Sequence, residues 1–238
     1  MGWRLHWQRL KRSLGRRWTE WRLPRGYERL GTRYGGWWIQ TRMIGPDPLL
    51  IDCGLGEDIS FPTAFLARFG GRVIGIEPNP RSLAWVEAHR PAGMELWRSA
   101  FWHSAQTMRF HLPRPKAQLP CGADGVSGSL ISSHEYVTGA DSFEVGTVTL
   151  AQVLGAAGRA QCDVLKLDIE GAEYEVLERL CASGEVRRIG QLLVEFHHRV
   201  THHRESDTRA AVRRIAACGF ELVHVEARNH IFRRVDPR

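Results

Sequence analysis

From Leu49 onward, short apolar segments alternate with amphipathic segments, and this alternation restricts the fold more than any other feature of the sequence. Apolar runs bounded by Gly, Asp or Pro are typical of buried strands, whereas apolar residues recurring every three or four positions indicate helices. Strands that alternate with helices predict βαβ units and a largely parallel sheet. We expect strands at 49–53, 72–77, 94–101, 162–168, 189–196, 221–225 and 230–235, and helices at 59–69, 81–89, 172–182 and 206–218.

Two parts of this α/β region break the alternation. Only 227–229 separates the last two strands, so we expect them to form an antiparallel pair at the edge of the sheet. Residues 113–140 are rich in Gly, Ser and Pro and show little periodicity. A loop this long in a compact domain is typically a lid or a binding loop, so we predict that it lies on the substrate side; a surface insertion is the alternative. The predicted domain, with this loop inside it, covers 41–238.

Residues 1–40 differ from the rest of the chain in charge and in pattern. Residues 1–33 contain ten Lys or Arg and two Glu, a net charge of +8, whereas the whole chain carries +7. An apolar stripe at spacings of three and four predicts an amphipathic helix, which Pro24 and Gly26 end. We predict a basic helical arm that packs on the domain or on a second subunit of a homo-oligomer. Contact of 1–33 with an anionic membrane surface is the alternative. The stripe consists of Trp3, Trp7, Leu10, Leu14, Trp18 and Trp21.

The cysteines and the hydropathy pattern bear on the compartment. Five cysteines, an odd number without CxxC spacing, indicate a reducing environment. No apolar run approaches the roughly 18 residues that a membrane span needs, and the first residues lack the apolar core of a secretory signal. We therefore expect a cytoplasmic protein, and we leave peripheral membrane contact open for the arm.

Glycines and carboxylates follow the first two expected strands. Asp52 ends the first strand, and Gly54 and Gly56 then allow the backbone to turn tightly and to approach a ligand. Glu77 ends the second strand, 25 residues after Asp52. A carboxylate at that position in dinucleotide-type folds binds ribose hydroxyls, so we predict that Glu77 binds a riboside. A solvated glutamate at the strand end is the alternative.

Two further carboxylates distinguish between candidate cofactors. Glu57 and Asp58 lie where the Gly-x-Gly-x-x-Gly fingerprint of a pyrophosphate site would continue. They repel a pyrophosphate but tolerate a cationic sulfonium or an amino-acid head group. We therefore predict S-adenosylmethionine rather than NAD. A nucleotide-dependent dehydrogenase with the same fold is the rival enzyme class.

A third group of carboxylates follows the strand at 162–168. Asp168, Glu170 and Glu173 lie around a turn into the next helix. Because the carboxyl ends of parallel strands meet at one edge of a sheet, we expect Asp168 to face the same cleft as Glu77. A cluster of carboxylates at a strand end is costly without a cationic partner or ligand.

A glutamate and a histidine lie at the end of the strand at 189–196. Alternation along the strand places Glu195 and His197 on one face, where they are candidates for proton transfer or for orienting a substrate; a structural histidine is the alternative. Nearby histidines are interleaved with arginines and lack Cys or Asp at ligand spacing, so we predict no metal site. These histidines are His198, His202 and His203.

Four blocks in this order resemble the FkbM family of class I methyltransferases. They are Leu-Ile-Asp-Cys-Gly at 50–54, Val-Ile-Gly-Ile-Glu-Pro-Asn-Pro at 73–80, Leu-Lys-Leu-Asp-Ile-Glu-Gly-Ala-Glu at 165–173 and Val-Glu-Phe-His at 194–197. The third block is the most specific, and the resemblance covers 48–236. It implies a Rossmann-like, mostly parallel seven-stranded sheet and methyl transfer to a hydroxyl of a sugar, glycan or natural product. One departure is that Gly56 and Asp58 stand where many relatives have an Asn and a later Gly.

The resemblance also implies roles for single residues. Asp52 and Gly54 would line the methionine part of the cofactor, Glu77 the ribose, and Ser99 with Ala100 the adenine. The complete set of expected cofactor-binding residues is Asp52, Cys53, Gly54, Leu55, Gly56, Glu77, Pro78, Asn79, Ser99, Ala100 and Asp168.

Methyl transfer to oxygen also requires removal of the hydroxyl proton. We expect either Asp168 or His197 to be the catalytic base, and Glu170, Glu173 and Glu195 to bind acceptor hydroxyls. The basic arm suggests RNA as an alternative acceptor, but the near-neutral remainder of the chain and the absence of an Asn-Pro-Pro-Tyr-type loop argue against nucleic acid. A non-catalytic, membrane-recruited protein that keeps the fold is the remaining alternative.

Overall fold

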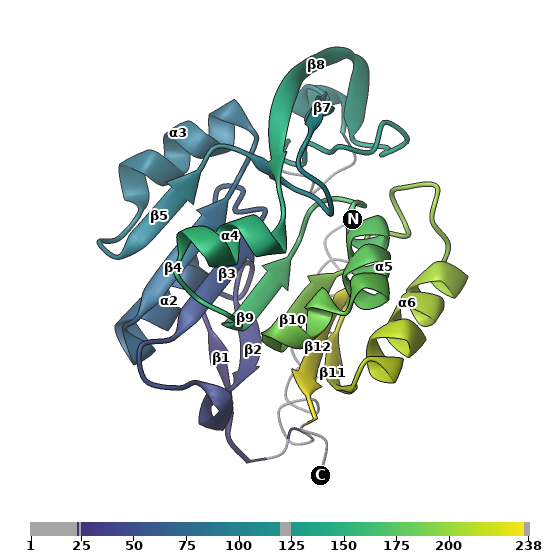
Figure 1. Cartoon of the computed structure of the whole chain (residues 1–238). Coiled ribbons are helices and arrows are strands. Elements are labelled where there is room, and N and C mark those ends of the chain that lie inside the picture. Colours follow the sequence, from purple (N-terminus) through teal and green to yellow (C-terminus); the bar gives the residue numbers. More distant parts are fainter. Residues whose placement is uncertain (1–22, 24, 120–124, 236–238) are drawn as a thin grey trace, which may run out of the picture.

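The computed structural model describes residues 23, 25–119 and 125–235 (Figure 1). The tryptophan-bearing helix expected within 1–21 therefore lies outside the described residues, as does part of the loop expected at 113–140. Among the residues that are described, no helix combines the length and the apolar character that a membrane crossing requires.

A seven-stranded sheet forms the centre of the molecule, in the order β11-β12-β10-β9-β3-β4-β5. The five strands from β10 to β5 are parallel, and β12 pairs with both β10 and β11 in antiparallel fashion. This confirms the Rossmann-like α/β fold and its antiparallel edge hairpin. The strands are β3 (Leu49–Cys53), β4 (Arg72–Ile76), β5 (Met94–Trp97), β9 (Cys162–Leu167), β10 (Ile189–Glu195), β11 (Phe220–Glu226) and β12 (Asn229–Arg234).

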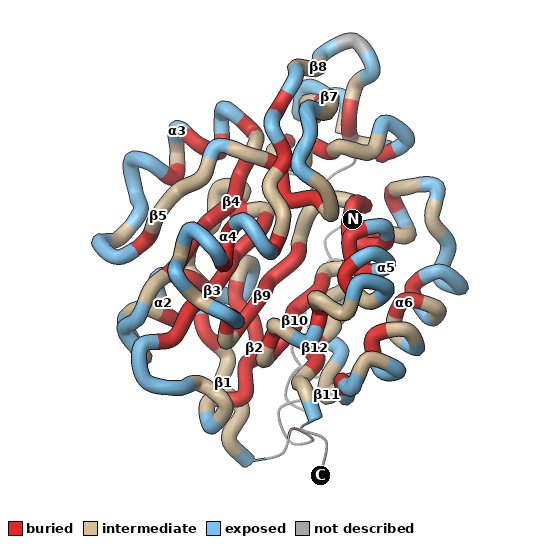
Figure 2. Tube along the Cα trace, viewed as in Figure 1, coloured by how far each residue is buried: buried red, intermediate tan, exposed pale blue. Residues whose placement is uncertain are grey.

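Helices cover both faces of this sheet (Figures 1 and 2). On each face, side chains of the helices and of the strands pack together in an apolar core. Because side chains alternate along a strand, Leu49 and Ile51 of β3 enter one core and Leu50 enters the other. The first core includes side chains of α4, α5 and α6, and the second includes side chains of α2 and α3. The helices are α2 (Ser60–Phe69), α3 (Pro80–His89), α4 (Leu150–Ala156), α5 (Glu173–Ser183) and α6 (Glu205–Ala217), and 3-10 turns lie at Thr41–Met43, Lys116–Gln118 and Glu185–Arg188.

Part of the expected N-terminal arm belongs to the folded domain. Residues Tyr27–Leu30 (β1) and Trp37–Gln40 (β2) form an antiparallel pair, so a helical arm reaching to residue 40 is wrong for this part. Trp37 and Ile39 are buried in the second core, which stabilises strands over a helix here. The Gln40 backbone N–H donates to Gln191 Oε1 of β10 at 2.7 Å and ties the pair to the sheet.

A second small sheet was not foreseen from the sequence. The expected strand at 94–101 divides at Arg98, because the chain leaves the main sheet there and Ala100–Phe101 (β6) pairs with a different strand. That strand, Val137–Val148 (β8), also pairs with Thr107–Pro113 (β7) in antiparallel fashion. The loop expected at 113–140 thus connects two strands of one hairpin and is shorter than predicted at its C-terminal end.

Candidate functional site

A cavity of about 1050 Å³ opens at the carboxyl ends of β3, β4, β9 and β10. Its inner wall, which we call the floor, consists of strand-end residues, and its outer edge, which we call the mouth, consists of residues from loops and hairpin turns. The floor comprises Gly54, Glu77, Lys166, Asp168, Glu170 and Glu195. The mouth comprises Arg33, Tyr34, Arg199 and Arg228.

The glycine loop after β3 is held by the glutamate at the end of β4. The backbone N–H groups of Leu55 and Gly56 donate to Glu77 Oε2 at 2.9 and 3.0 Å, and that of Asn79 donates to Oε1 at 2.8 Å. Burial raises the pKa of Glu77, and these N–H donors oppose the rise. Gly54 has a φ of 82°, and a Cβ there would overlap the backbone carbonyl oxygen of Asp168. Only glycine therefore fits where β3 and β9 end against each other.

Lys166 of β9 connects this strand to β3 at the floor of the cavity. It is the register partner of Asp52, and its Nζ lies 3.1 Å from Asp52 Oδ1 and 3.7 Å from Asp168 Oδ2. The same Nζ donates to the Gly54 carbonyl oxygen at 2.6 Å. Burial lowers the pKa of Lys166, but the two carboxylates outweigh burial and raise it overall. Lys166 is therefore a charged group that orients both the glycine loop and Asp168.

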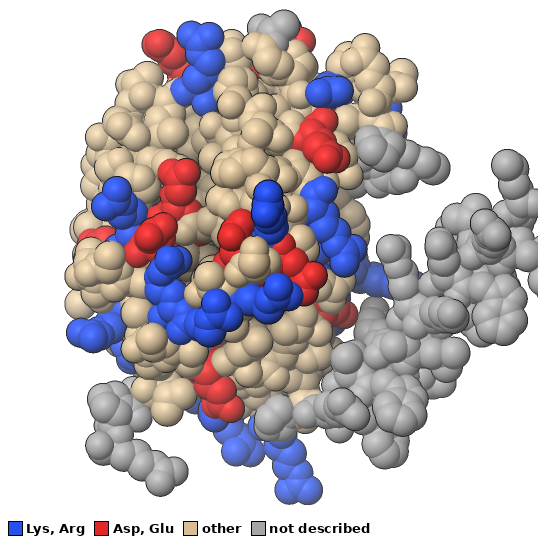
Figure 3. Space-filling view, turned by 90° about the vertical axis from the view of Figure 1, so that its right-hand side faces the viewer, with Lys and Arg blue, Asp and Glu red and all other residues tan. Residues whose placement is uncertain are grey.

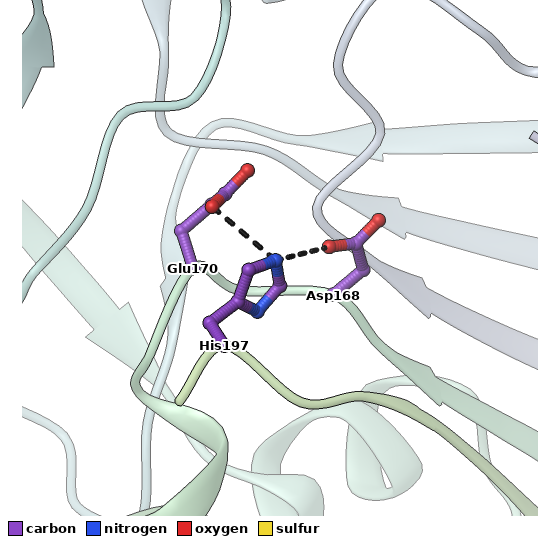
Figure 4. Close-up of side chains that lie close together, drawn as sticks. All are labelled: Asp168, Glu170 and His197. Carbon is purple, nitrogen blue, oxygen red and sulfur yellow. Dashed lines mark ion pairs between the residues drawn. The ribbon is translucent and has the colours of Figure 1, made fainter. Parts of the chain in front are cut away.

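His197 lies behind the floor, and Figure 4 shows one of its ring nitrogens directed at Asp168 and Glu170. Its Nδ1 lies 2.8 Å from Glu173 Oε1, and its Nε2 lies 3.3 Å from Glu170 Oε2 and 3.6 Å from Asp168 Oδ1. Burial lowers the pKa of His197, but Glu170 and Glu173 raise it well above its usual value. The surrounding carboxylates therefore favour the protonated imidazole, in which both ring nitrogens donate.

Glu173 is directed away from the cavity, contrary to the expectation that it binds acceptor hydroxyls. Its carboxylate is fully buried and accepts the backbone N–H groups of Ile169 and Gly171, both at 2.9 Å, in addition to the contact with His197. It therefore fixes the turn after β9 and the orientation of His197.

The two carboxylates that face the cavity beside His197 have pKa values shifted in opposite directions. Burial and the neighbouring Glu195 raise the pKa of Asp168 to about 8, although Lys166 and His197 oppose the rise. Burial also raises the pKa of Glu170, but His197 and His134 outweigh burial and lower it to about 2. Near neutral pH, Glu170 is therefore ionised, whereas Asp168 is able to gain or lose a proton.

His134 joins the loop after β7 to this cluster. Its Nδ1 accepts the Tyr136 backbone N–H at 3.1 Å, so Nε2 carries the proton and donates to Glu170 Oε2 at 2.9 Å. Ser129 Oγ donates to the Glu170 carbonyl oxygen at 2.6 Å. The loop therefore borders the cavity. The role of His134 was missed from the sequence because this contact spans 36 positions and leaves no local pattern.

The structure brings together most of the residues expected at the site, but not all of them line the cavity. Asp52 and Cys53 are buried beneath it, Asp52 against Lys166, and Ser99 lies outside its wall. Asn79 is also behind the wall, where it caps α3 and binds the Val126 carbonyl oxygen. The expected residues that do line it are Gly54, Leu55, Gly56, Glu77, Pro78, Ala100, Asp168, Glu170 and Glu195.

One group of side chains has the composition of a metal site. Asp168, Glu170 and His197 offer ligand atoms that all lie within 4.8 Å of one another. A cation there would require His197 Nε2 to lose its proton, which the raised pKa of this histidine opposes. The sequence-based prediction of no metal stays a prediction.

The cavity fits S-adenosylmethionine, the cofactor expected from the sequence. Carboxyl groups at and behind the floor outnumber the cations Lys166 and His197, so the floor favours a positively charged ligand such as a sulfonium. The absence of a side chain at Gly54 leaves the loop backbone accessible, and a cavity of about 1050 Å³ has room for a cofactor and an acceptor. Gly54 to Gly56, Glu77 and Ala100 would hold the cofactor.

Comparisons with known proteins agree with this arrangement. The methyltransferase FkbM domain matches residues 52–222. A probable methyltransferase-like protein 24 from Homo sapiens is 43% identical over 150 residues, which are 62% of this chain and 32% of that protein. Its Rattus norvegicus counterpart is 27% identical over 150 residues, with the same shares. The chain thus matches 32% of the length of these curated relatives.

Among solved structures, the fibrillarin pre-rRNA processing protein of Methanococcus jannaschii is 13% identical, with a TM-score of 0.43 over 81% of this chain and 67% of that chain. Aeropyrum pernix fibrillarin, which was crystallised with natively bound S-adenosylmethionine, is 13% identical, with a TM-score of 0.40 over 82% of this chain and 68% of that chain. The sequence match spans the floor from Asp52 to Glu195. The chain therefore belongs to the FkbM family of methyltransferases, which use S-adenosylmethionine as methyl donor.

Proposed function

We propose that this methyltransferase acts on a hydroxyl oxygen of a sugar, a glycan or a natural product, and that Asp168 is its general base. The main support for the proposal is the exposure of the Asp168 side chain together with its raised pKa. Its side chain is 28% exposed at the floor, and its pKa is raised to about 8. A general base is most effective when its pKa lies near the working pH.

The residues around Asp168 support this assignment. S-adenosylmethionine, when bound, supplies a methyl group activated by positively charged sulfur. A hydroxyl gains nucleophilicity when it donates its proton to a carboxylate, and Asp168 Oδ1 and Oδ2 are within reach of the cavity. His197 is already protonated, so its part is to hold Asp168 and Glu170 in place rather than to accept the proton.

Glu170 and Glu195 supply further hydrogen-bond acceptors at the floor. Both line the cavity, and Glu170 is ionised at neutral pH. Acceptor-only carboxylates beside the base suit a compound with several hydroxyl donors, such as a sugar. This supports a hydroxyl-rich acceptor.

The charges on the face that carries α6 support a small-molecule or glycan acceptor over nucleic acid. On the face that carries α6, Lys and Arg are interspersed with Asp and Glu (Figure 3). Arg209 Nη1 lies 2.8 Å from Glu205 Oε1, and Arg214 Nη2 lies 3.6 Å from Glu178 Oε1. Such alternation does not create the field of one sign that nucleic-acid binding requires.

The cytoplasmic location, the homo-oligomer and the membrane contact of 1–33 stay predictions.

The test is a panel of sugars, glycans and hydroxylated natural products incubated with the protein and S-adenosylmethionine. We expect S-adenosylhomocysteine to be released and nuclear magnetic resonance to show a new O-methyl group. Asp168→Asn should lower kcat by about 10²- to 10⁴-fold. The matched control Asp47→Asn changes a carboxylate that is 80% exposed and should keep the rate. A methyl group found on nitrogen or carbon, or a full rate in Asp168→Asn, would contradict the proposal.

A further inference from the structure

The carboxylates at the edge of the cavity are already bound by other groups. Glu57 Oε1 lies 2.6 Å from Arg81 Nε, and Asp58 accepts the Thr32 hydroxyl at 2.7 Å and the Ser60 backbone N–H at 2.8 Å. Arg81 therefore neutralises Glu57, whereas Asp58 is held by neutral donors against the turn between β1 and β2.

Glu226 of β11 and the floor residue Glu195 of β10 also form ion pairs with arginines. Glu226 Oε2 lies 3.4 Å from Arg29 Nε, and Glu195 forms an ion pair with Arg228. Arg29 further donates to the carbonyl oxygens of Thr32 and Arg33. Arg29 and Arg228 are thus engaged in holding the two hairpin turns that frame the mouth.

Arg33 and Arg199 differ from these two arginines. Both residues line the cavity and are exposed, and neither forms an ion pair within the part of the chain that the structure describes. Arg33 lies on the turn between β1 and β2, whereas Arg199 follows β10, so they reach the mouth from different elements. Among the described residues, the mouth therefore has two guanidinium groups without an acidic partner.

We propose that Arg33 and Arg199 bind an anionic group, a phosphate or a carboxylate, carried by the acceptor whose hydroxyl is directed toward Asp168. This inference rests on the proposed function and specifies its substrate class as a phosphorylated or carboxylated hydroxyl compound. Guanidinium groups form strong charge-assisted hydrogen bonds with such anions. The floor rejects an anion because its carboxyl groups outnumber its cations, so the acceptor enters with its hydroxyl inward and its charge outward.

An aromatic ring lies beside Arg33 at the mouth. Tyr34 is 74% exposed and lines the cavity from the same turn. Aromatic faces pack against sugar rings and nucleobases, and both occur in compounds that also carry phosphate. Residues 33 and 34 precede the region matched by the family domain, 52–222, whereas Arg199 lies within it.

One other anion can reach the mouth, because S-adenosylmethionine has a carboxylate of its own. The test therefore separates the two sources. Inorganic pyrophosphate is titrated by calorimetry into the full chain saturated with S-adenosylhomocysteine, in which the cofactor carboxylate is already present. The double variant Arg33→Gln/Arg199→Gln is compared with Arg213→Gln, an exposed arginine on α6 away from the cavity. The basic residues before position 33 are the same in all three proteins.

We expect pyrophosphate to bind the double variant at least about tenfold more weakly than the wild type, because two charge-assisted contacts are lost. The Arg213→Gln control should stay within about twofold, and the affinity of all three proteins for S-adenosylhomocysteine should be unchanged within about twofold. Equal pyrophosphate binding by the double variant and the control overturns the proposal, as does a loss confined to S-adenosylhomocysteine affinity. Since this readout needs no turnover, it is independent of whether the acceptor atom is oxygen.

Discussion

The floor and the mouth of the same cavity differ in whether their charged side chains have partners of opposite charge. At the floor, Lys166 and Asp168 have several charged partners each, and His197 behind them is almost fully buried. At the mouth, Arg33 and Arg199 are exposed and have no acidic partner among the described residues. The floor and Arg199 lie inside the family match at 52–222, whereas Arg33, Tyr34 and Arg228 lie outside it. The difference is one of charge pairing: the charged groups of the floor contact one another, whereas the mouth leaves two arginines available, as the proposed binding of an anionic acceptor requires.

The strongest test of the floor is Gly54→Ala. A Cβ at this position would overlap the Asp168 carbonyl oxygen, and the φ of 82° is unfavourable for alanine, so the ends of β3 and β9 would have to separate. We expect binding of S-adenosylhomocysteine, measured by calorimetry, to weaken by more than about 100-fold. Gly155→Ala in α4, where a Cβ meets nothing within 4 Å, should bind like the wild type. Normal binding by Gly54→Ala would show that the floor is not rigid.

Lys166→Met should have the next largest effect, on stability as well as on binding. The variant leaves the buried Asp52 carboxylate without its cation and frees the Gly54 carbonyl oxygen. Removal of one partner of a buried ion pair costs about 3–5 kcal/mol, so the free energy of unfolding in urea should fall by that order. Lys166→Arg should recover part of the loss because it keeps the charge. If Lys166→Met unfolds at the wild-type urea concentration, the lysine does not hold the floor together.

The pH dependence of kcat/KM tests the electrostatics of the floor. Asp168 must be deprotonated to accept a proton, so the rate should rise with pH and level off above a midpoint of about 8. Glu195→Gln removes a negative neighbour that raises this pKa, so the midpoint should fall. His197→Gln removes a positive neighbour that lowers it, so the midpoint should rise. Shifts in the same direction in the two variants would contradict the roles assigned to Glu195 and His197.

The sequence predicts the floor well and the mouth poorly, for a physical reason. Asp52, Glu77 and Asp168 each end an apolar run, and the geometry of a parallel sheet then brings strand ends together whatever the loops do. Ser99 was misplaced because the chain changes sheets at that point, which depends on long-range pairing with β8. The role of Lys166 could not be predicted, because its partner Asp52 is more than 100 positions away in the sequence.

The mouth lacks such a local signal. Arg33 is the last basic residue of the segment 1–33 and follows Pro24 and Gly26, which end its predicted helix. Only the burial of Trp37 and Ile39 in the second core reveals the hairpin that carries Arg33. Arg199 is one of several arginines among histidines after β10. Which of these cations stay without an acidic partner depends on where Glu195 and Glu226 find theirs, and this is a property of the folded chain.

Arg33→Gln should have the smallest effect of these variants on stability. Arg33→Gln removes an exposed side chain that has no ion pair in the described part of the chain, so the free energy of unfolding should change by no more than about 0.5 kcal/mol. The same urea titration that detects the loss in Lys166→Met serves as the measurement. The pH midpoint of kcat/KM should also stay at the wild-type value, because Arg33 is not among the charges that shift the pKa of Asp168. A destabilisation approaching that of Lys166→Met would mean that the mouth is part of the structural scaffold, and the contrast between the floor and the mouth would then fail.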